Sequence, residues 1–117
     1  MASSQKYALQ ASAALTAATT NAASQNLPAR ARKLIGHINV SACHADTTAT
    51  AKIQHSPDGT NWYDYISFTA VAGAVAVEAK APSSNDLACF QNVRATIVLA
   101  GTTKAATVAI DLWFENY

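Results

Sequence analysis

The sequence predicts an all-β domain, an antiparallel β-sandwich of about eight strands preceded by an extended N-terminal arm. Apolar and polar residues alternate with a period of two over most of the chain after residue 28, as in strands with one buried face. Turn residues separate these runs at intervals of about 8–12 residues, which is typical of sandwiches. Because 117 residues suit a single core, we expect an arm over residues 1–28 and one domain over residues 29–117.

The expected arm is almost free of large apolar and charged side chains. Between residues 8 and 26 only Leu9 and Leu15 depart from Ala, Ser, Thr, Asn and Gln, and Lys6 is the only charge before residue 30. Tyr7, Leu9 and Leu15 share a face in a strand, whereas Tyr7 and Leu15 share one almost as well in a helix. We favour an extended arm with a short strand near residues 7–15. Such an arm could lie across a partner subunit, or it could be a disordered terminus.

The strands of the domain are predicted from runs in which every second residue is apolar. After Leu27-Pro28, residues 34–43 form a long run, with Leu34, Gly36 and Ile38 on its buried face. Similar alternation predicts strands over residues 49–54, 66–68, 75–80, 93–99 and 107–115.

Residues 53–68, IQHSPDGTNWYDYISF, predict the central hairpin. Residues 56–59, SPDG, fit a type I turn closed by a bulge, because Pro presets φ at the first corner and Gly accepts the left-handed conformation. Trp62, Tyr63 and Tyr65 follow directly, where they can pack across strands.

Two features point to contacts with other molecules. Trp113 falls on the outward face of the last strand, with Asp111 and Glu115, so it is either covered by its own chain or placed at a subunit contact. Arg30, Arg32 and Lys33 form the only basic cluster, which is either solvated or touches an acidic partner.

The low charge favours assembly over nucleic-acid binding. Charged residues make up 13% of the chain and the formal net charge is +1, whereas nucleic-acid binding depends mainly on phosphate neutralisation. No apolar stretch reaches the about 20 residues that span a bilayer, and no secretion signal is apparent. We therefore expect no membrane contact, synthesis in a reducing cytoplasm, and free thiols at Cys43 and Cys89, although their pairing cannot be read from sequence.

No residue set predicts a reaction or a cofactor. Asp58, Asn61 and Asp64 supply oxygen ligands but do not have the spacing of a calcium loop. The possible zinc ligands are scattered without a paired motif: His37, Cys43, His44 and His55. Neither a nucleophile motif nor a glycine-rich phosphate loop occurs, so we expect no enzyme activity, metal or cofactor.

Three segments together resemble small virion proteins of tailed bacteriophages: LPARARKLIGHINVSA, TATAKIQHSPDGTNWYDYISFTAV and RATIVLAGTTKAATVAIDLWF. The resemblance covers residues 27–114 and rests on structural motifs. It implies a jelly-roll-like fold, of the kind found in capsid decoration (cement) proteins and in tail or head-fibre components, and an oligomer on a virus surface. The longer Ala-rich N-terminal segment departs from this pattern.

Together these observations predict a decoration protein that binds the outside of the capsid and stabilises it. Its partners would be the major capsid protein and further copies of itself, as a trimer or otherwise a dimer, on the virion surface and, during assembly, in the host cytoplasm. The alternative is a fibre component that binds carbohydrate or a receptor through Trp62, Tyr63 and Tyr65. The expected partner-binding residues are Tyr7, Leu9, Leu15, Arg30, Arg32, Lys33 and Trp113.

Overall fold

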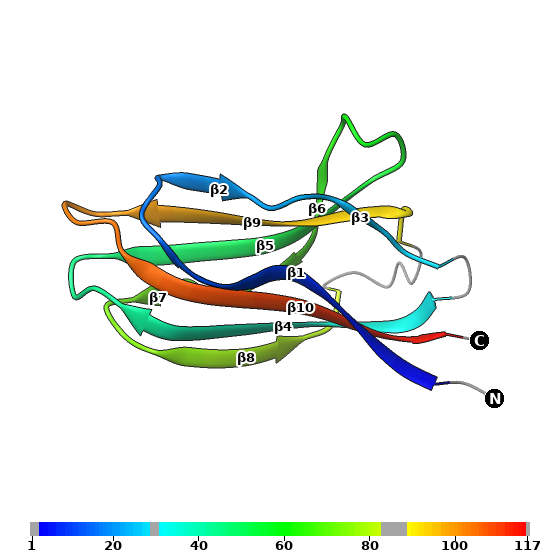
Figure 1. Cartoon of the computed structure of the whole chain (residues 1–117), viewed down its shortest axis with the longest axis horizontal. Helices are drawn as coiled ribbons and strands as arrows, with labels where there is room; N and C mark the ends of the chain where they lie inside the picture. The colour runs from blue at the N-terminus through cyan, green and yellow to red at the C-terminus, as the bar shows by residue number, and fades with distance from the viewer. Residues whose placement is uncertain (1–2, 29–30, 83–88, 117) are drawn as a thin grey trace.

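The computed structural model of the chain describes residues 3–28, 31–82 and 89–116. Over these residues the fold contains ten strands in two antiparallel sheets and no helix (Figure 1). The prediction of an all-β antiparallel sandwich is therefore confirmed. Because the described part contains no helix, it offers none that could cross a membrane.

The first sheet has the strand order β1-β10-β4-β8. Its members are β1 (Ser3–Leu15), β10 (Ala106–Asn116), β4 (Ala31–Cys43) and β8 (Ala76–Lys80). The second sheet has the order β2-β9-β5-β6, with β3 paired to β9 and β7 paired to β5. Its members are β2 (Thr19–Asn21), β3 (Gln25–Asn26), β5 (Thr48–Ser56), β6 (Tyr63–Ser67), β7 (Val71–Ala72) and β9 (Asn92–Ala100).

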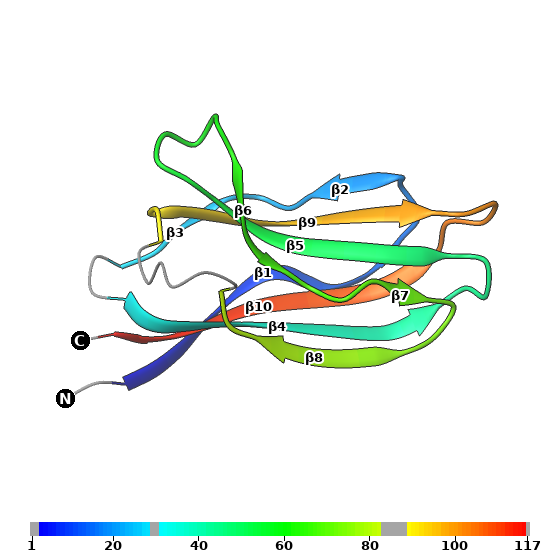
Figure 2. The same ribbon diagram turned by 180° about the vertical axis from the view of Figure 1, so that it is seen from behind.

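These ten segments occupy the eight positions of a jelly roll. Strands β2 and β3 lie one after the other along β9, and β6 and β7 lie one after the other along β5, so each pair acts as one interrupted strand (Figure 2). The chain then passes between the sheets in the order of two interlocking Greek keys, which defines this architecture. The ladder from β5 to β9 joins nine residue pairs without a bulge.

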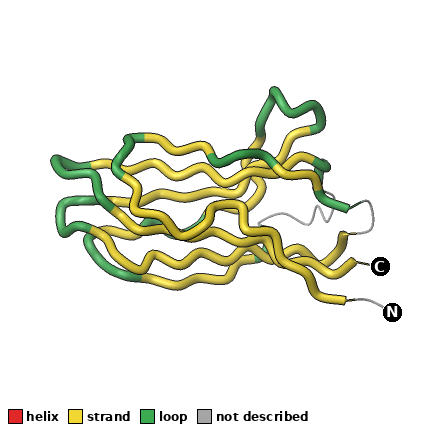
Figure 3. Tube along the Cα trace, viewed as in Figure 1, coloured by secondary structure: helices red, strands yellow, loops and turns green. Residues whose placement is uncertain are grey.

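The core lies between the sheets, as the alternating residues predict, and strands make up most of the trace around it (Figure 3). Strand β10 contributes Val108, Ile110, Leu112 and Phe114, and none of them is more than 2% exposed. On β4, Gly36 brings the sheets into contact, because a Cβ there would lie 2.9 Å from both Ile53 Cδ1 and Phe68 Cζ. A side chain at this position would therefore force Ile53 and Phe68 to move.

The expected division into an arm and a domain differs from the structure. The described residues before 29 form β1, β2 and β3, and β1 pairs with β10 of the same chain over ten residue pairs. Leu9 and Leu27 are 3% and 5% exposed, so they belong to the core. The segment is extended as expected, but it supplies an edge to each sheet because its backbone hydrogen bonds are satisfied there.

The central hairpin forms, but its connection is longer than the expected tight turn. Strand β5 ends at Ser56 and β6 begins at Tyr63, which leaves a six-residue loop over residues 57–62. The Asp58 carboxylate organises this loop, accepting hydrogen bonds from the backbone N–H groups of Thr60 and Asn61 at 2.9 and 2.8 Å. Gly59 adopts φ 77°, the left-handed conformation expected for it. The same hydrogen bonds hold the pKa of Asp58 well below its usual range.

Candidate functional site: the outward face of the first sheet

The outward face of the first sheet carries most of the exposed large apolar side chains in the described part of the chain. Ile35, Val77 and Trp113 are 44%, 66% and 43% exposed, and Val75, just before β8, is 67% exposed. We call these four residues the apolar patch. Single exposed apolar residues are ordinary on protein surfaces, whereas a group on one face is typical of an interaction site.

Strand register places Trp113 in the middle of one row of this face. In the two ladders of β10, Trp113 lies opposite Lys6 of β1 and opposite Ile35 of β4. The Lys6 ammonium lies 5.5 Å from the centre of the Trp113 ring, within the range of a cation–π contact. Trp113 is thus held from one side by its own chain while nearly half of it faces solvent.

The next rows of the face are small or polar. Asp111 lies between Ala8 and His37, and His37 in turn lies opposite Ala79 of β8. In the row beyond, Val77 lies opposite the exposed Asn39. The face therefore combines the apolar patch with Lys6, Asp111 and the ion pair between Lys33 and Glu115.

The valines face solvent because the polar residues of β8 are needed on its other side. The Glu78 carboxylate accepts hydrogen bonds from the backbone N–H and the hydroxyl of Thr69, both at 2.8 Å, and the Lys80 ammonium donates to the Ser67 carbonyl at 2.7 Å. These bonds tie β8 to the second sheet, and the Thr69 contacts lower the pKa of Glu78. Because side chains alternate, Val77 must then point outward.

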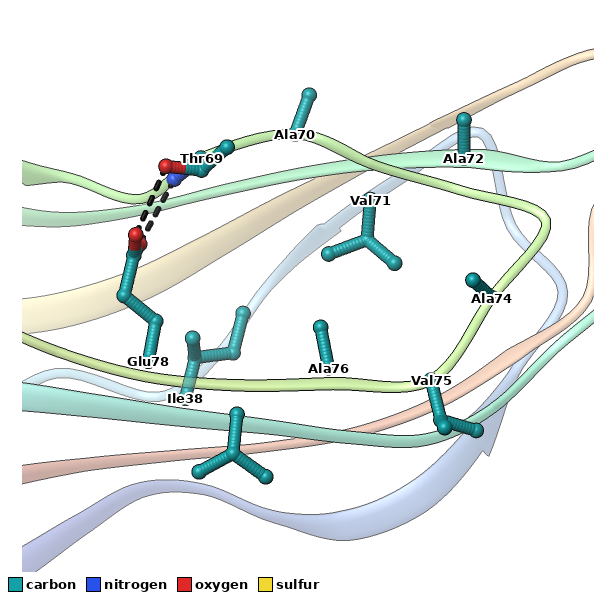
Figure 4. A pocket seen from close by; sticks show the side chains of 10 residues that line it. Ile38, Thr69, Ala70, Val71, Ala72, Ala74, Val75, Ala76 and Glu78 are labelled. Atoms are coloured by element: carbon teal, nitrogen blue, oxygen red, sulfur yellow. Dashed lines mark hydrogen bonds between the residues drawn. The ribbon is translucent and has the colours of Figure 1, made fainter.

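A cleft of about 350 Å³ lies between β8 and the segment that contains β7 (Figure 4). Val71 and Ala76 face each other across it beside Ile38, whereas Val75 points away, and the Glu78–Thr69 hydrogen bonds lie at its far end. Its lining is mainly apolar and offers one carboxylate, which already binds Thr69.

The outward face of the second sheet is built differently. A chain of polar contacts crosses it: Arg94 Nε donates to Gln54 Oε1 at 3.0 Å, Gln54 Nε2 donates to Asp64 Oδ1 at 3.0 Å, and Lys52 Nζ donates to Asp64 Oδ2 at 2.8 Å. Trp62 covers one end, with the Arg94 guanidinium 4.4 Å from its ring centre. We call this the polar network. Its polar groups already have partners.

Three of the expected partner-binding residues contribute to the core of their own chain. Leu9 is buried, and the ring of Tyr7 packs edge-on against Phe114 with centres 5.1 Å apart. Leu15 is half-buried against the same core. Their contacts with another subunit stay a prediction, but the structure does not place them on an exposed arm.

The expected basic cluster is only partly visible. Arg30 lies outside the described residues, and Arg32 lies in β4 opposite Glu115, with its side chain not described. Lys33 is exposed at φ 55°, beside a break in the regular pairing of β4 with β10, and its ammonium lies 3.3 Å from the Glu115 carboxylate. Lys33 is therefore part of a surface ion pair.

The aromatic residues of the hairpin do not form one platform. Tyr65 is buried with its ring 4.7 Å from that of His55, Tyr63 is 55% exposed, and Trp62 is stacked on Arg94. Burial raises the pKa of Tyr65 above its usual value and lowers that of His55. Of the three residues expected to form a sugar platform, Tyr65 is therefore withdrawn into the core, and carbohydrate binding by Trp62 and Tyr63 stays a prediction.

The described cysteines and acidic residues do not form a metal centre. Over residues 3–28, 31–82 and 89–116, no group of three or more His, Cys, Asp or Glu could hold a metal ion. Cys43 and Cys89 are free, half-buried thiols, and burial raises the pKa of Cys89 to about 12. A thiol with that pKa is a poor nucleophile near neutral pH.

Sequence reasoning identified Trp113 but missed its partners on the patch. Ile35 could have been found, because it alternates onto the same face as His37 and Asn39, where an isoleucine stands out among polar residues. Val75 and Val77 gave no such signal, since valines on a strand ordinarily face the core.

Comparison with known proteins supports the fold. No protein-family model matches the sequence, and no curated protein matches it. The structure is similar to a chain in the structure of infectious bursal disease virus Gx strain, with a TM-score of 0.65 and 12% identity, covering 98% of this chain and 32% of that chain. The chain thus spans about a third of that protein's length. At this identity the similarity concerns the fold alone.

Proposed function

We propose that the protein is a structural component of a virion that binds the outside of the capsid through the apolar patch and stabilises the shell. It acts as a decoration protein, and its partner is the major capsid protein. The observation that carries this proposal is that four of the exposed large apolar side chains lie on one outward sheet face, Trp113 beside Ile35 in one row and Val77 on β8 with Val75 just before it.

Three further features support a binding role on a virus particle. The fold is similar to part of a chain from a virus structure, and the low charge of the chain favours close packing against other proteins. Trp113 is the type of residue that dominates binding energy when it becomes fully buried at an interface. On the opposite face the polar network is bonded within itself, and we infer that the patch is the better docking surface.

The experiment measures co-sedimentation of the purified protein with undecorated capsids of the virus that encodes it. Trp113→Ser and Val77→Ser should each weaken binding at least tenfold, because truncation of a buried interface anchor costs about 2 kcal/mol or more. The matched control is Val98→Ser, which removes a 43% exposed valine from the second sheet and should leave binding unchanged.

Equal loss with Val98→Ser would move the contact to the other face. No binding by the unaltered protein would refute the capsid role. In that case glycan-array binding that disappears with Tyr63→Ala would favour a fibre component that recognises carbohydrate. Retained binding by both patch variants would show that another surface holds the capsid.

A further inference from the structure

The edges of a sandwich carry unpaired backbone N–H and C=O groups, and proteins usually protect them. Three of the four edges here are protected. Strand β8 has five residues and its Glu78 and Lys80 are bonded to the second sheet. The β2/β3 edge consists of pieces of three and two residues, and the β6/β7 edge of pieces of five and two.

Strand β1 is the exception. It runs for 13 residues at the border of the first sheet, contains no proline, and carries Lys6 as its only charge. Within the described part of the chain, β10 is the only strand paired to it. A single lysine is little protection for an edge of this length, which can pair with another strand if the register keeps Lys6 away from a second positive charge.

The available part of this edge is its first half. Residues 3–8 pair with β10 in unbroken register, whereas shifts follow between Ala8 and Gln10 and between Gln10 and Ala13. From Ala8 onward, side-chain amides already use backbone carbonyls: Gln25 Nε2 donates to Ala8 O and Gln10 Nε2 donates to Ala11 O, both at 2.8 Å. Regular pairing with a second strand is therefore open to residues 3–7.

We propose that β1 pairs antiparallel with β1 of a second copy of this chain, about a twofold axis at Gln5. Two identical antiparallel strands related by such an axis place one residue opposite itself. An axis at Lys6 would set two ammonium groups face to face, which is unfavourable, and an axis at Tyr7 would draw the shifted half into the pairing. An axis at Gln5 pairs residues 3–7 of both copies and sets Lys6 opposite Ser4.

This pairing joins two first sheets into one sheet of eight strands, with both apolar patches on the same side. It favours the dimer over the trimer as the oligomeric state. Five residue pairs bury less area than the about 1,600 Å² of a typical stable interface, so the dimer dissociates on dilution. Self-pairing is independent of capsid binding and is measured on the protein alone.

The test uses analytical ultracentrifugation of the full chain over a wide concentration range. Gln5 is exposed, so Gln5→Glu and Gln5→Lys should fold, yet each should abolish the dimer by placing like charges opposite each other. Mixing the two variants should restore a heterodimer. The control Ser12→Glu adds the same charge as Gln5→Glu to an exposed position in the shifted half and should leave the dimer intact.

A second measurement fixes the register. Gln5→Cys should form a disulfide-linked dimer under mild oxidation, since the paired residues at the axis have the Cα separation that a disulfide requires, whereas Lys6→Cys should not. A monomer at all concentrations would overturn the proposal. A dimer that is unaffected by charge at position 5 would also overturn it. A complex formed only with capsid protein would overturn it as well, because β1 would then pair with a strand of that protein.

Discussion

The two outward faces of the sandwich differ in how their side chains are satisfied. On the second sheet, Arg94, Gln54, Asp64 and Lys52 bond to one another across the strands. On the first sheet, the apolar patch shares its face with His37, Asn39 and charged residues that, in the part of the chain that the structure describes, are not joined into one chain of contacts. A face that bonds within itself gains little from a partner, whereas an apolar face gains by leaving water.

The same alternating strand pattern is therefore compatible with two kinds of outward face, one apolar and one covered by bonded polar groups. Both faces arise from alternation of residues above the same core, and the sandwich would fold with either kind of outward residue. Under the proposed function, the apolar patch serves binding rather than folding. Four predictions test whether the patch is dispensable for the fold and the polar network is not.

The largest expected difference in stability is between substitutions of Leu112 and Trp113, which are neighbours on β10. Leu112→Ala should lower the free energy of unfolding by about 2–5 kcal/mol, because it leaves a cavity in the core. Trp113→Ala should lower it by about 1 kcal/mol or less, since the side chain is 43% exposed. Denaturant unfolding of both variants measures the difference. Equal losses of unfolding free energy would mean that Trp113 supports the fold as much as Leu112 does, which would contradict a binding role for its exposed side chain.

On β4, the inward Gly36 and the outward Ile35 should differ in the same way when they are substituted. Gly36→Val should destabilise the protein by about 1–3 kcal/mol, because the new side chain collides with Ile53 and Phe68. Ile35→Thr, on the outward side of the same strand, should change stability by about 0.5 kcal/mol or less. Thermal unfolding followed by circular dichroism measures both. A tolerated Gly36→Val would show that the sheets can separate.

The third prediction compares the outward faces directly. Asp64→Ala should cost about 0.5–1.5 kcal/mol, because Lys52 and Gln54 lose their shared acceptor, and solvent screening sets the effect near the lower end. Val77→Ser should be close to neutral in the isolated protein. Chemical denaturation at neutral pH gives both values. A stabilising Asp64→Ala would show that the network serves another purpose.

The smallest effect is a pH dependence of the polar network. Hydrogen bonding to Lys52 lowers the pKa of Asp64 below its usual 3.8, so the ionised carboxylate stabilises the fold above that pH. This contribution is lost as the pH falls through the lowered pKa. The stability difference between the unaltered protein and Asp64→Asn should therefore shrink on acidification in melting experiments. An unchanged difference at low pH would exclude the ionised form as its source.

The fold class and most of the inward faces follow from the alternation of apolar and polar residues alone. Strands such as β9 and β10 place large apolar residues at every second position, and burial of those residues leaves one orientation for the strand. Trp113 could be placed outward for the same reason, since turning it inward would expose Leu112 and Phe114. Gly59 in a loop was equally predictable from its permitted φ.

Features that depend on partners far away in the chain became visible only in the folded molecule. The small side chains of residues 1–28 fit an edge strand or a free arm equally well, and the choice came from the open backbone groups of β10 and β9. Strand β8 turned its valines outward because Glu78 and Lys80 found acceptors and donors on the second sheet. The two-residue period of a strand predicts which residues share a face. Which of the two faces points into the core depends on the contacts that the folded chain offers to each.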